Sequence, residues 1–212
     1  MLVHVKALFT DIRRGDIAAV TRRIDADPSL VDAVATAPPK SDDGQSALQV
    51  AIKTGAFAIA ELLIDRGADV RFVDRSDINS WNTPVVHDAI RAAVMSSRFG
   101  RNHAPPGDDP RIEIANRPER FEAARSLLER MIEAGADVTA VDSFGNDGLG
   151  RCALDAEQVI DEPVNVELDD DLTQLFSMLF AAGADAGRVD PRFGVALSTR
   201  YADRPVGRYL TP

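Results

Sequence analysis

Apolar side chains recur at intervals of three and four residues in three stretches of the chain, 57–66, 121–134 and 171–182. This spacing puts the apolar residues on one side of an α-helix, so each stretch is predicted to form an amphipathic helix with one buried face. The apolar stripes consist of Ile59, Leu62 and Leu63; Phe121, Ala124, Leu127, Leu128, Met131 and Ile132; and Leu172, Leu175, Phe176 and Leu179.

The same short motif follows each of these predicted helices. It reads GADVRFVD at 67–74, GADVTAVD at 135–142 and GADAGRVD at 183–190. A glycine directly after a helix often adopts the left-handed conformation that ends it, so the first residue of each motif is predicted to be a helix terminator. The rest of the motif is predicted to form an extended turn. Upstream of the first motif, Ser46 is predicted to cap a short helix over 47–53.

Residues 43–74 resemble a unit of the ankyrin repeat family. That unit has about 33 residues and carries the pattern Thr-Pro-Leu-His-x-Ala. Here Ser46 stands for the threonine, Leu48 for the leucine, Gln49 for the histidine and Ala51 for the alanine.

Three further units resemble the family in part. In the third unit Thr83 and Pro84 match the pattern, with one residue inserted before His87. The fourth unit keeps the apolar and small positions at 145–153 but has glycines for the proline and the histidine. The first unit, 4–33, has two predicted helices without the pattern, as expected of a terminal capping repeat.

This resemblance implies an all-α fold, an ankyrin-repeat solenoid of stacked helix–turn–helix units with extended finger turns. A single domain over 1–212 is expected. Its repeats are expected at 1–42, 43–74, 75–142 and 143–190, followed by a tail at 191–212. The arginines of the tail are hypothesised to fold back on the fourth repeat, so that the tail caps the open end of the solenoid.

Two inserts lengthen the third and fourth repeats, at 98–117 and 156–171. Glycine and proline clusters in the first insert, within 96–120, predict a loop. Loops of this length are usually functional or disordered, so the inserts are either decoration or part of a partner surface.

The net charge of −10 is concentrated in the fourth repeat. Between 155 and 171 there are eight carboxylates and no cation. Such a block is typical of a flexible, solvated loop, and the alternative is a surface that steers a basic partner. A calcium site is disfavoured because the ligand spacing and glycine of an EF-hand loop are missing. The acidic balance also argues against a nucleic-acid partner.

Catalytic and metal-binding patterns are largely missing from the sequence. The three histidines do not have metal-ligand spacing, and His87 matches the structural histidine of the family. Cys152, the one cysteine, is expected in the core. No cofactor is expected. A rival hypothesis, an enzyme or small-ligand binder built on the inserts, would use His103, Asp108, Asp109 and Glu113.

The resemblance implies a non-catalytic module that binds a partner protein in the concave groove between the fingers and the inner helices. A more specific version is an inhibitor or immunity-type protein for a basic target. The apolar start of the chain is too short for a signal peptide and no run is long enough to span a membrane, so a cytoplasmic monomer is expected. Aromatic residues and arginines dominate interface hot spots, although Phe72 and Trp81 could instead pack against neighbouring fingers. The predicted partner-binding residues are Phe72, Arg75, Ile78, Trp81 and Phe144 on the fingers, and Arg101 and His103 in the first insert.

Overall fold

The computed structural model describes residues 2–76, 78, 81–102, 104, 109 and 111–211. Within these residues the chain is mostly helical, with two pairs of short strands. The α-helices are α1 (Leu2–Arg13), α2 (Ile17–Ala26), α3 (Ala47–Lys53), α4 (Phe57–Asp65), α5 (Val85–Ser96), α6 (Pro118–Glu133), α7 (Gly148–Ala156), α8 (Val166–Ala181) and α9 (Leu197–Arg200). The strands are β1 (Gly100–Asn102), β2 (Ile112–Ile114), β3 (Val189–Asp190) and β4 (Val195–Ala196), and short 3-10 helices cover Pro28–Asp32, Lys40–Asp42 and Pro205–Tyr209.

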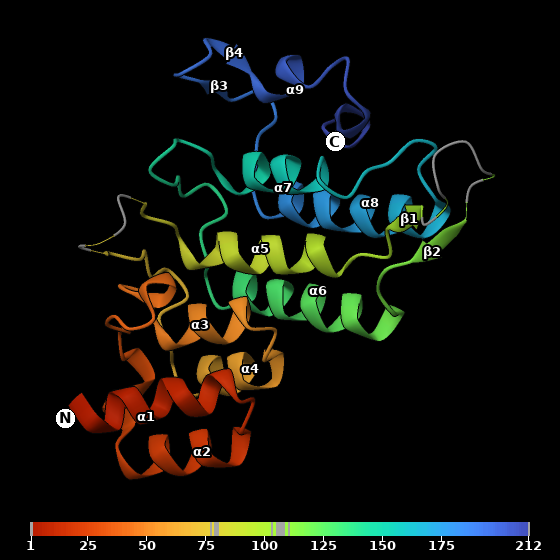
Figure 1. Cartoon of the computed structure of the whole chain (residues 1–212). Helices are drawn as coiled ribbons and strands as arrows, with labels where there is room; N and C mark the ends of the chain where they lie inside the picture. Colours follow the sequence, from red (N-terminus) through yellow and green to blue (C-terminus); the bar gives the residue numbers. More distant parts are fainter. Residues whose placement is uncertain are drawn as a thin grey trace.

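The first eight helices form pairs that stack in chain order (Figure 1). Helices α1, α3, α5 and α7 contact one another in sequence and form an inner row, and α2, α4, α6 and α8 form an outer row behind them. One connected cluster of buried apolar side chains runs through the stack from Leu8 to Leu210. In the described part of the chain, no helix has the length and apolar character needed to cross a bilayer.

The repeated motif after α4, α6 and α8 adopts the same conformation each time. Gly67, Gly135 and Gly183 have φ angles of 88°, 95° and 97°, which confirms their predicted role as helix terminators. The aspartate two residues later, Asp69, Asp137 or Asp185, accepts a hydrogen bond from a backbone N–H two positions on, at 2.7–2.8 Å. This local bond turns the chain out of the helix and into the finger, because an aspartate side chain can imitate a backbone turn.

The first insert is not the featureless loop that its glycines and prolines predicted. Strands β1 and β2 form an antiparallel pair in which Arg101 faces Glu113. Two asparagines hold the base of this hairpin. Asn116 donates to the carbonyls of Met95 and Ser97, both at 2.9 Å, and Asn165 contacts the backbone of Arg98 and Gly100 at 2.9 and 3.1 Å. The hairpin is therefore fixed to the ends of α5 and α8.

The second insert, expected over 156–171, is helical at 156 and 166–171, so the predicted acidic loop is wrong for those residues. Ala156 ends α7 and Val166 begins α8, which leaves only 157–165 as a connection. Leu168 and Leu172 are buried at helical spacing. Acidic side chains in the first turn of a helix are stabilised by the helix dipole, so the charge run favours this helix instead of opposing it.

The tail packs on the fourth helix pair. The ring of Tyr209 stacks on Phe176 with 5.4 Å between centroids, and its hydroxyl donates to Asp169 at 2.7 Å. Arg204 pairs with Glu157 at 2.8 Å and Arg208 with Glu162 at 3.1 Å. Residues 195–200 also resemble the start of a unit. Ala196, before α9, pairs with Val189 of the preceding finger, as Ser46 pairs with Val34 and Pro84 with Val73.

Candidate groove between fingers and inner helices

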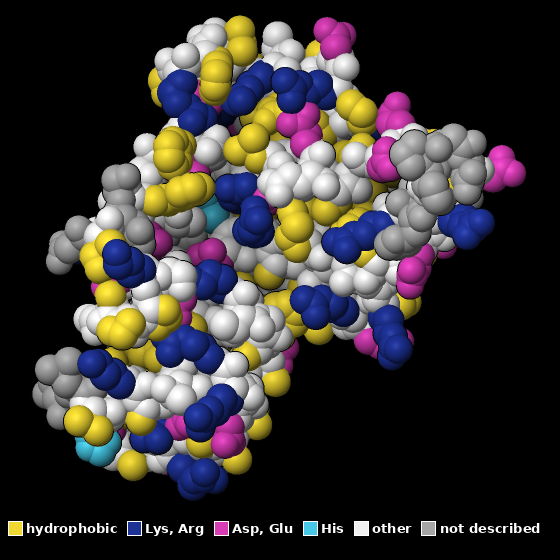
Figure 2. All heavy atoms as spheres, in the orientation of Figure 1, with side chains coloured by type: hydrophobic (Ala, Val, Ile, Leu, Met, Phe, Trp, Pro, Cys, Tyr) yellow, Lys and Arg dark blue, Asp and Glu magenta, His cyan; other side chains and the backbone are white. Residues whose placement is uncertain are grey.

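A hollow of about 780 Å³ lies between the finger turns and the inner helices α3, α5 and α7. Figure 2 shows this face, with apolar side chains along the finger edge and Lys and Arg side chains along the middle. The hollow is lined by Ser41, Asp43, Gln45, Lys53, Asp74, Ile78, Trp81, Thr83, His87, Asp88, Arg91, Arg151 and Gln158.

An aromatic pair forms the rim of the hollow on the finger side. Trp81 and Phe144 are 44% and 50% exposed, and their rings meet edge to face with 4.8 Å between centroids. The two fingers that carry them are joined by backbone contacts. The N–H of Ser143 donates to the carbonyl of Asn82 at 3.0 Å, and the N–H of Asn82 donates to the Ser143 hydroxyl at 3.2 Å. The pair is thus held in place while remaining accessible to a partner.

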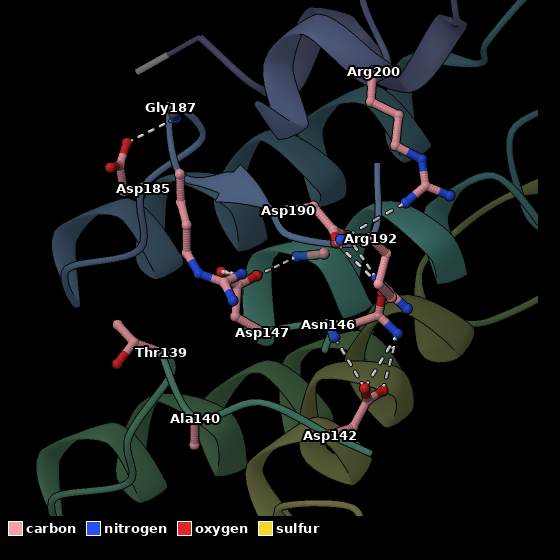
Figure 3. Close-up of polar contacts among 12 residues, drawn as sticks. Thr139, Ala140, Asp142, Asn146, Asp147, Asp185, Gly187, Asp190, Arg192 and Arg200 are labelled. Atoms are coloured by element: carbon pink, nitrogen blue, oxygen red, sulfur yellow. Dashed lines mark hydrogen bonds and ion pairs between the residues drawn. The ribbon is translucent and has the colours of Figure 1, made fainter. Parts of the chain in front are cut away.

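The finger that carries Phe144 is also linked to the finger that follows α8 (Figure 3). Arg192 lies between Asp190 and Asn146, donating to them at 2.6 and 2.8 Å, and Asn146 in turn donates to Asp142 at 3.0 Å. Hydrogen bonds from Arg192 lower the pKa of Asp190 to about 2, so this carboxylate stays charged over the physiological range. The finger edge from Trp81 onward therefore forms one connected surface.

Carboxylates on the finger side of the hollow are engaged by the chain's own donors. Asp74 is buried and accepts from the N–H of Thr83, and burial raises its pKa. Asp88, on α5, accepts from the amide of Gln49 at 3.0 Å. Burial raises the pKa of Asp88 to about 6, because neither a salt bridge nor a backbone N–H compensates its charge. Asp88 therefore changes charge near neutral pH.

Arginines converge on the other side of the hollow. Asp155 is fully buried and receives Arg91 from α5 at 2.5 Å and Arg151 from its own helix at 2.7 Å. Gln158 completes the set with an amide bond at 3.2 Å. Two guanidinium groups thus share one buried carboxylate beside the hollow.

His87 is buried under the hollow and has a structural contact. Its Nε2 donates to the carbonyl of Ala140 in the next finger at 3.0 Å, and burial lowers its pKa, so the ring is neutral at physiological pH. Its Nδ1 has no hydrogen-bond partner among the described residues. Pro84 stands where Ser46 and Asp147 cap the helices of the neighbouring pairs, and it has no side-chain oxygen to offer.

The start of α5 lies in a different register from the one that the sequence pattern of the third unit predicted. Pro84 and Ser46 form equivalent β-bridges and precede their helices by the same distance, so His87 occupies the third helical position, as Gln49 does. No residue is inserted before His87. The expected match of Thr83 and Pro84 to the family pattern is shifted by one position, since Pro84 takes the place of the capping residue.

The predicted partner-binding residues lie in two separate places. Ile78, Trp81 and Phe144 are exposed along the finger edge, and Arg75 is exposed on the same finger as Trp81. Phe72 is half-buried and packs against the core, so it contributes little to this surface.

Arg101 lies on β1, where its guanidinium covers the ring of Phe99 at 5.1 Å. Helix α5 begins at the fingers and ends at this hairpin, and a helix of 12 residues is roughly 18 Å long. The hairpin and the finger edge therefore do not form one patch. His103 and Asp108 lie outside the described residues; Asp109 and Glu113 are exposed. No group of three or more His, Cys, Asp or Glu that could hold a metal ion occurs in the described part of the chain.

Sequence reasoning missed Asp88, Arg91 and Arg151. Asp88 and Arg91 are one turn apart on α5 and face the same hollow, but helical spacing alone could not show that Asp155, 64 residues further on, lies behind them.

Residues 43–75 match the family model of the ankyrin repeat. No curated protein matches the chain. The match and the helix-rich architecture support an ankyrin-repeat protein with an all-α repeat fold, and ankyrin repeats in general mediate protein–protein interactions and are not catalytic.

Proposed function

We propose that this chain is a non-catalytic protein-interaction module, a solenoid of four ankyrin repeats over 1–42, 43–74, 75–142 and 143–190 that binds a partner protein in the groove described above. The observation that carries the proposal is the exposed Trp81–Phe144 pair on the rim of the 780 Å³ hollow. Large aromatic side chains contribute most of the energy in many interfaces, and exposing two of them in contact has no benefit for the isolated fold.

The rigidity of the fingers also supports binding at this edge. Backbone and side-chain hydrogen bonds join the fingers at Asn82, Ser143, Asn146 and Arg192. A surface that is ordered before association loses little conformational entropy when a partner docks.

The tail is proposed to cap the solenoid. Terminal repeats need a cover for their apolar face. Tyr201, Val206 and Leu210 are almost completely buried against the fourth helix pair, as a cap requires.

A basic target, and with it an inhibitor or immunity-type role, finds less support. Of the eight carboxylates between 155 and 171, Asp155, Glu157, Glu162 and Asp171 form ion pairs with the chain's own arginines. Half of these carboxylates are therefore paired within the molecule, which leaves fewer of them for a basic target than the sequence suggested. The rival enzyme built on the inserts gains no support from the described residues, where Asp109 and Glu113 are exposed.

The proposal is tested by recovering the partner from the organism that makes the protein. Tagged wild type is compared with the double variant Trp81→Ala/Phe144→Ala and with a matched control, Ile112→Ala/Ile114→Ala, which removes two exposed apolar side chains from the hairpin. The groove variant should lose the partner and the hairpin variant should keep it, with both retaining the wild-type melting temperature. Loss with the hairpin variant alone would place the interface on the insert and contradict the proposal.

A further inference from the structure

The charged groups of the groove differ in how many of their hydrogen-bonding atoms remain available. Lys53 is saturated, because its ammonium contacts Asp42 at 2.9 Å and the oxygens of Ser41 and Gln45 at 2.6 Å. Asp43 accepts from Ala37 at 2.9 Å and from Ser76 at 2.7 Å. These two residues line the hollow but offer little to a ligand.

Arg91 is the opposite case. Its side chain is 47% exposed, and one of its N–H groups donates to Asp155. A guanidinium has five donors in a planar fork, and among the described residues the others of Arg91 have no partner. The side chain is anchored at one end, permanently charged and open to the hollow.

Asp155 does not neutralise this charge. It also accepts both a 2.7 Å bond and a second contact from Arg151, whose side chain is only 12% exposed. One buried carboxylate therefore balances one of two guanidinium groups. The Arg91 side chain lies partly out of water, where its interaction with an anion is stronger than on an open surface.

A carboxylate of the same helix also lines the hollow, and part of it is already engaged by the chain. Asp88 is one turn before Arg91 and is partly buried, with one oxygen bonded to Gln49 at 3.0 Å. Figure 2 shows that Lys and Arg side chains predominate along this part of the face. Among the described residues that line the hollow, Arg91 is the exposed cation whose remaining N–H groups are not used by the chain.

From this arrangement we infer that the groove selects an acidic partner segment, in which an Asp or Glu carboxylate binds the free N–H groups of Arg91 and a neighbouring apolar side chain packs on Trp81 and Phe144. The inference rests on the proposed function and adds the chemistry of the partner. A planar carboxylate fits the guanidinium fork through two parallel hydrogen bonds.

Trp81 is the only tryptophan in the chain, so its fluorescence reports directly on the rim of the hollow. The test titrates the full-length protein with three eight-residue peptides in which Leu alternates with Glu, Lys or Gln. The Glu peptide should change Trp81 emission at a concentration roughly tenfold or more below the Lys and Gln peptides, because charge-assisted hydrogen bonds contribute about that factor. The difference should shrink as salt is added.

Arg91→Gln should abolish the preference for the Glu peptide. Asp155 keeps Arg151 and Gln158 in that variant, so the fold is retained, and melting checks this. Arg130→Gln is the matched control. That arginine is 40% exposed and pairs with Asp65 on the outer row, so its loss should leave the preference unchanged.

Tighter binding of the Lys peptide, an unchanged preference in Arg91→Gln, or no response of Trp81 to any peptide would overturn the inference. Equal binding of the Glu and Gln peptides would overturn the acidic preference while leaving the groove as the binding surface. The proposed function fails separately, if the natural partner is still recovered by Trp81→Ala/Phe144→Ala.

Discussion

Asp170 and Asp171 are adjacent in the acidic segment but lie in opposite environments. Asp171 is fully buried and accepts from the backbone and side chain of Arg98, with contacts of 2.6–3.1 Å. Asp170 is exposed and has no hydrogen bond or ion pair among the described residues. Substituting each by Asn removes the same charge with almost the same shape, so the pair isolates the effect of the buried contact.

Asp171→Asn should lower the free energy of unfolding by about 3 kcal/mol, because it leaves the Arg98 guanidinium without its counter-ion. This is the lower end of the range for buried pairs, since the Arg98 side chain is 21% exposed. Asp170→Asn should change stability by less than about 0.5 kcal/mol. Urea unfolding followed by far-UV circular dichroism should show a midpoint lower by on the order of 1 M for the first variant alone. Equal shifts for the two variants would refute the view that Asp171 anchors the first insert to α8.

Three further predictions concern buried or partly buried groups. The raised pKa of Asp88 means that the folded protein holds this proton more tightly than the unfolded chain, so the associated stability is present below about pH 4 and is lost as pH rises through about 6. The free energy of unfolding of Asp88→Asn, measured with urea, should therefore rise relative to that of wild type by roughly 2 to 3 kcal/mol between pH 4 and pH 8. A difference that stays constant with pH would contradict the burial of this carboxyl. Cys152 is fully buried, and burial raises the pKa of its thiol. A thiol reagent at pH 8 should therefore modify Cys152 only after the protein unfolds. Rapid reaction of the folded protein would contradict its place in the core. Tyr209→Ala should lower the free energy of unfolding by about 3 kcal/mol, because it removes the stack on Phe176. Tyr209→Phe should lower it by only about 1 kcal/mol, because it removes just the hydrogen bond to Asp169. Equal losses of stability in thermal melting would argue against packing by the tail.

Local patterns predicted the helices and their ends well. The stripe that contains Ile59 and Leu63 became the buried face of α4, and Ser46 caps α3 in a reciprocal capping box with Gln49. These features depend on residues within one turn of each other, and the spacing of apolar and capping residues carries that information directly.

Features that depend on distant residues were not predictable. The acidic run around Asp171 was read as a solvated loop, because its charge alone favours that state, and its partner Arg98 is 73 residues away. Strands β1 and β2 are three residues each, too short to show alternation. The position of His87 was misread because the Thr-Pro pair resembles the family pattern, while the bridge between Val73 and Pro84 sets the actual register.

The charge of the groove could not be predicted for the same reason. Arg91 and Arg151 meet only because α5 and α7 are neighbours in the inner row, and the buried carboxylate between them belongs to a segment whose composition suggested exposure. A net charge of −10 for the chain is thus compatible with a binding face that presents arginines.

The central claim is that a protein partner docks in the groove along the finger edge. Photo-crosslinking in the native host tests it most directly, with a benzophenone amino acid placed at Phe144 on the rim or at Glu122 on the outer helix α6. The account predicts a crosslinked partner from position 144 that is missing from position 122. Crosslinks to the same protein from position 122 and none from position 144 would contradict it.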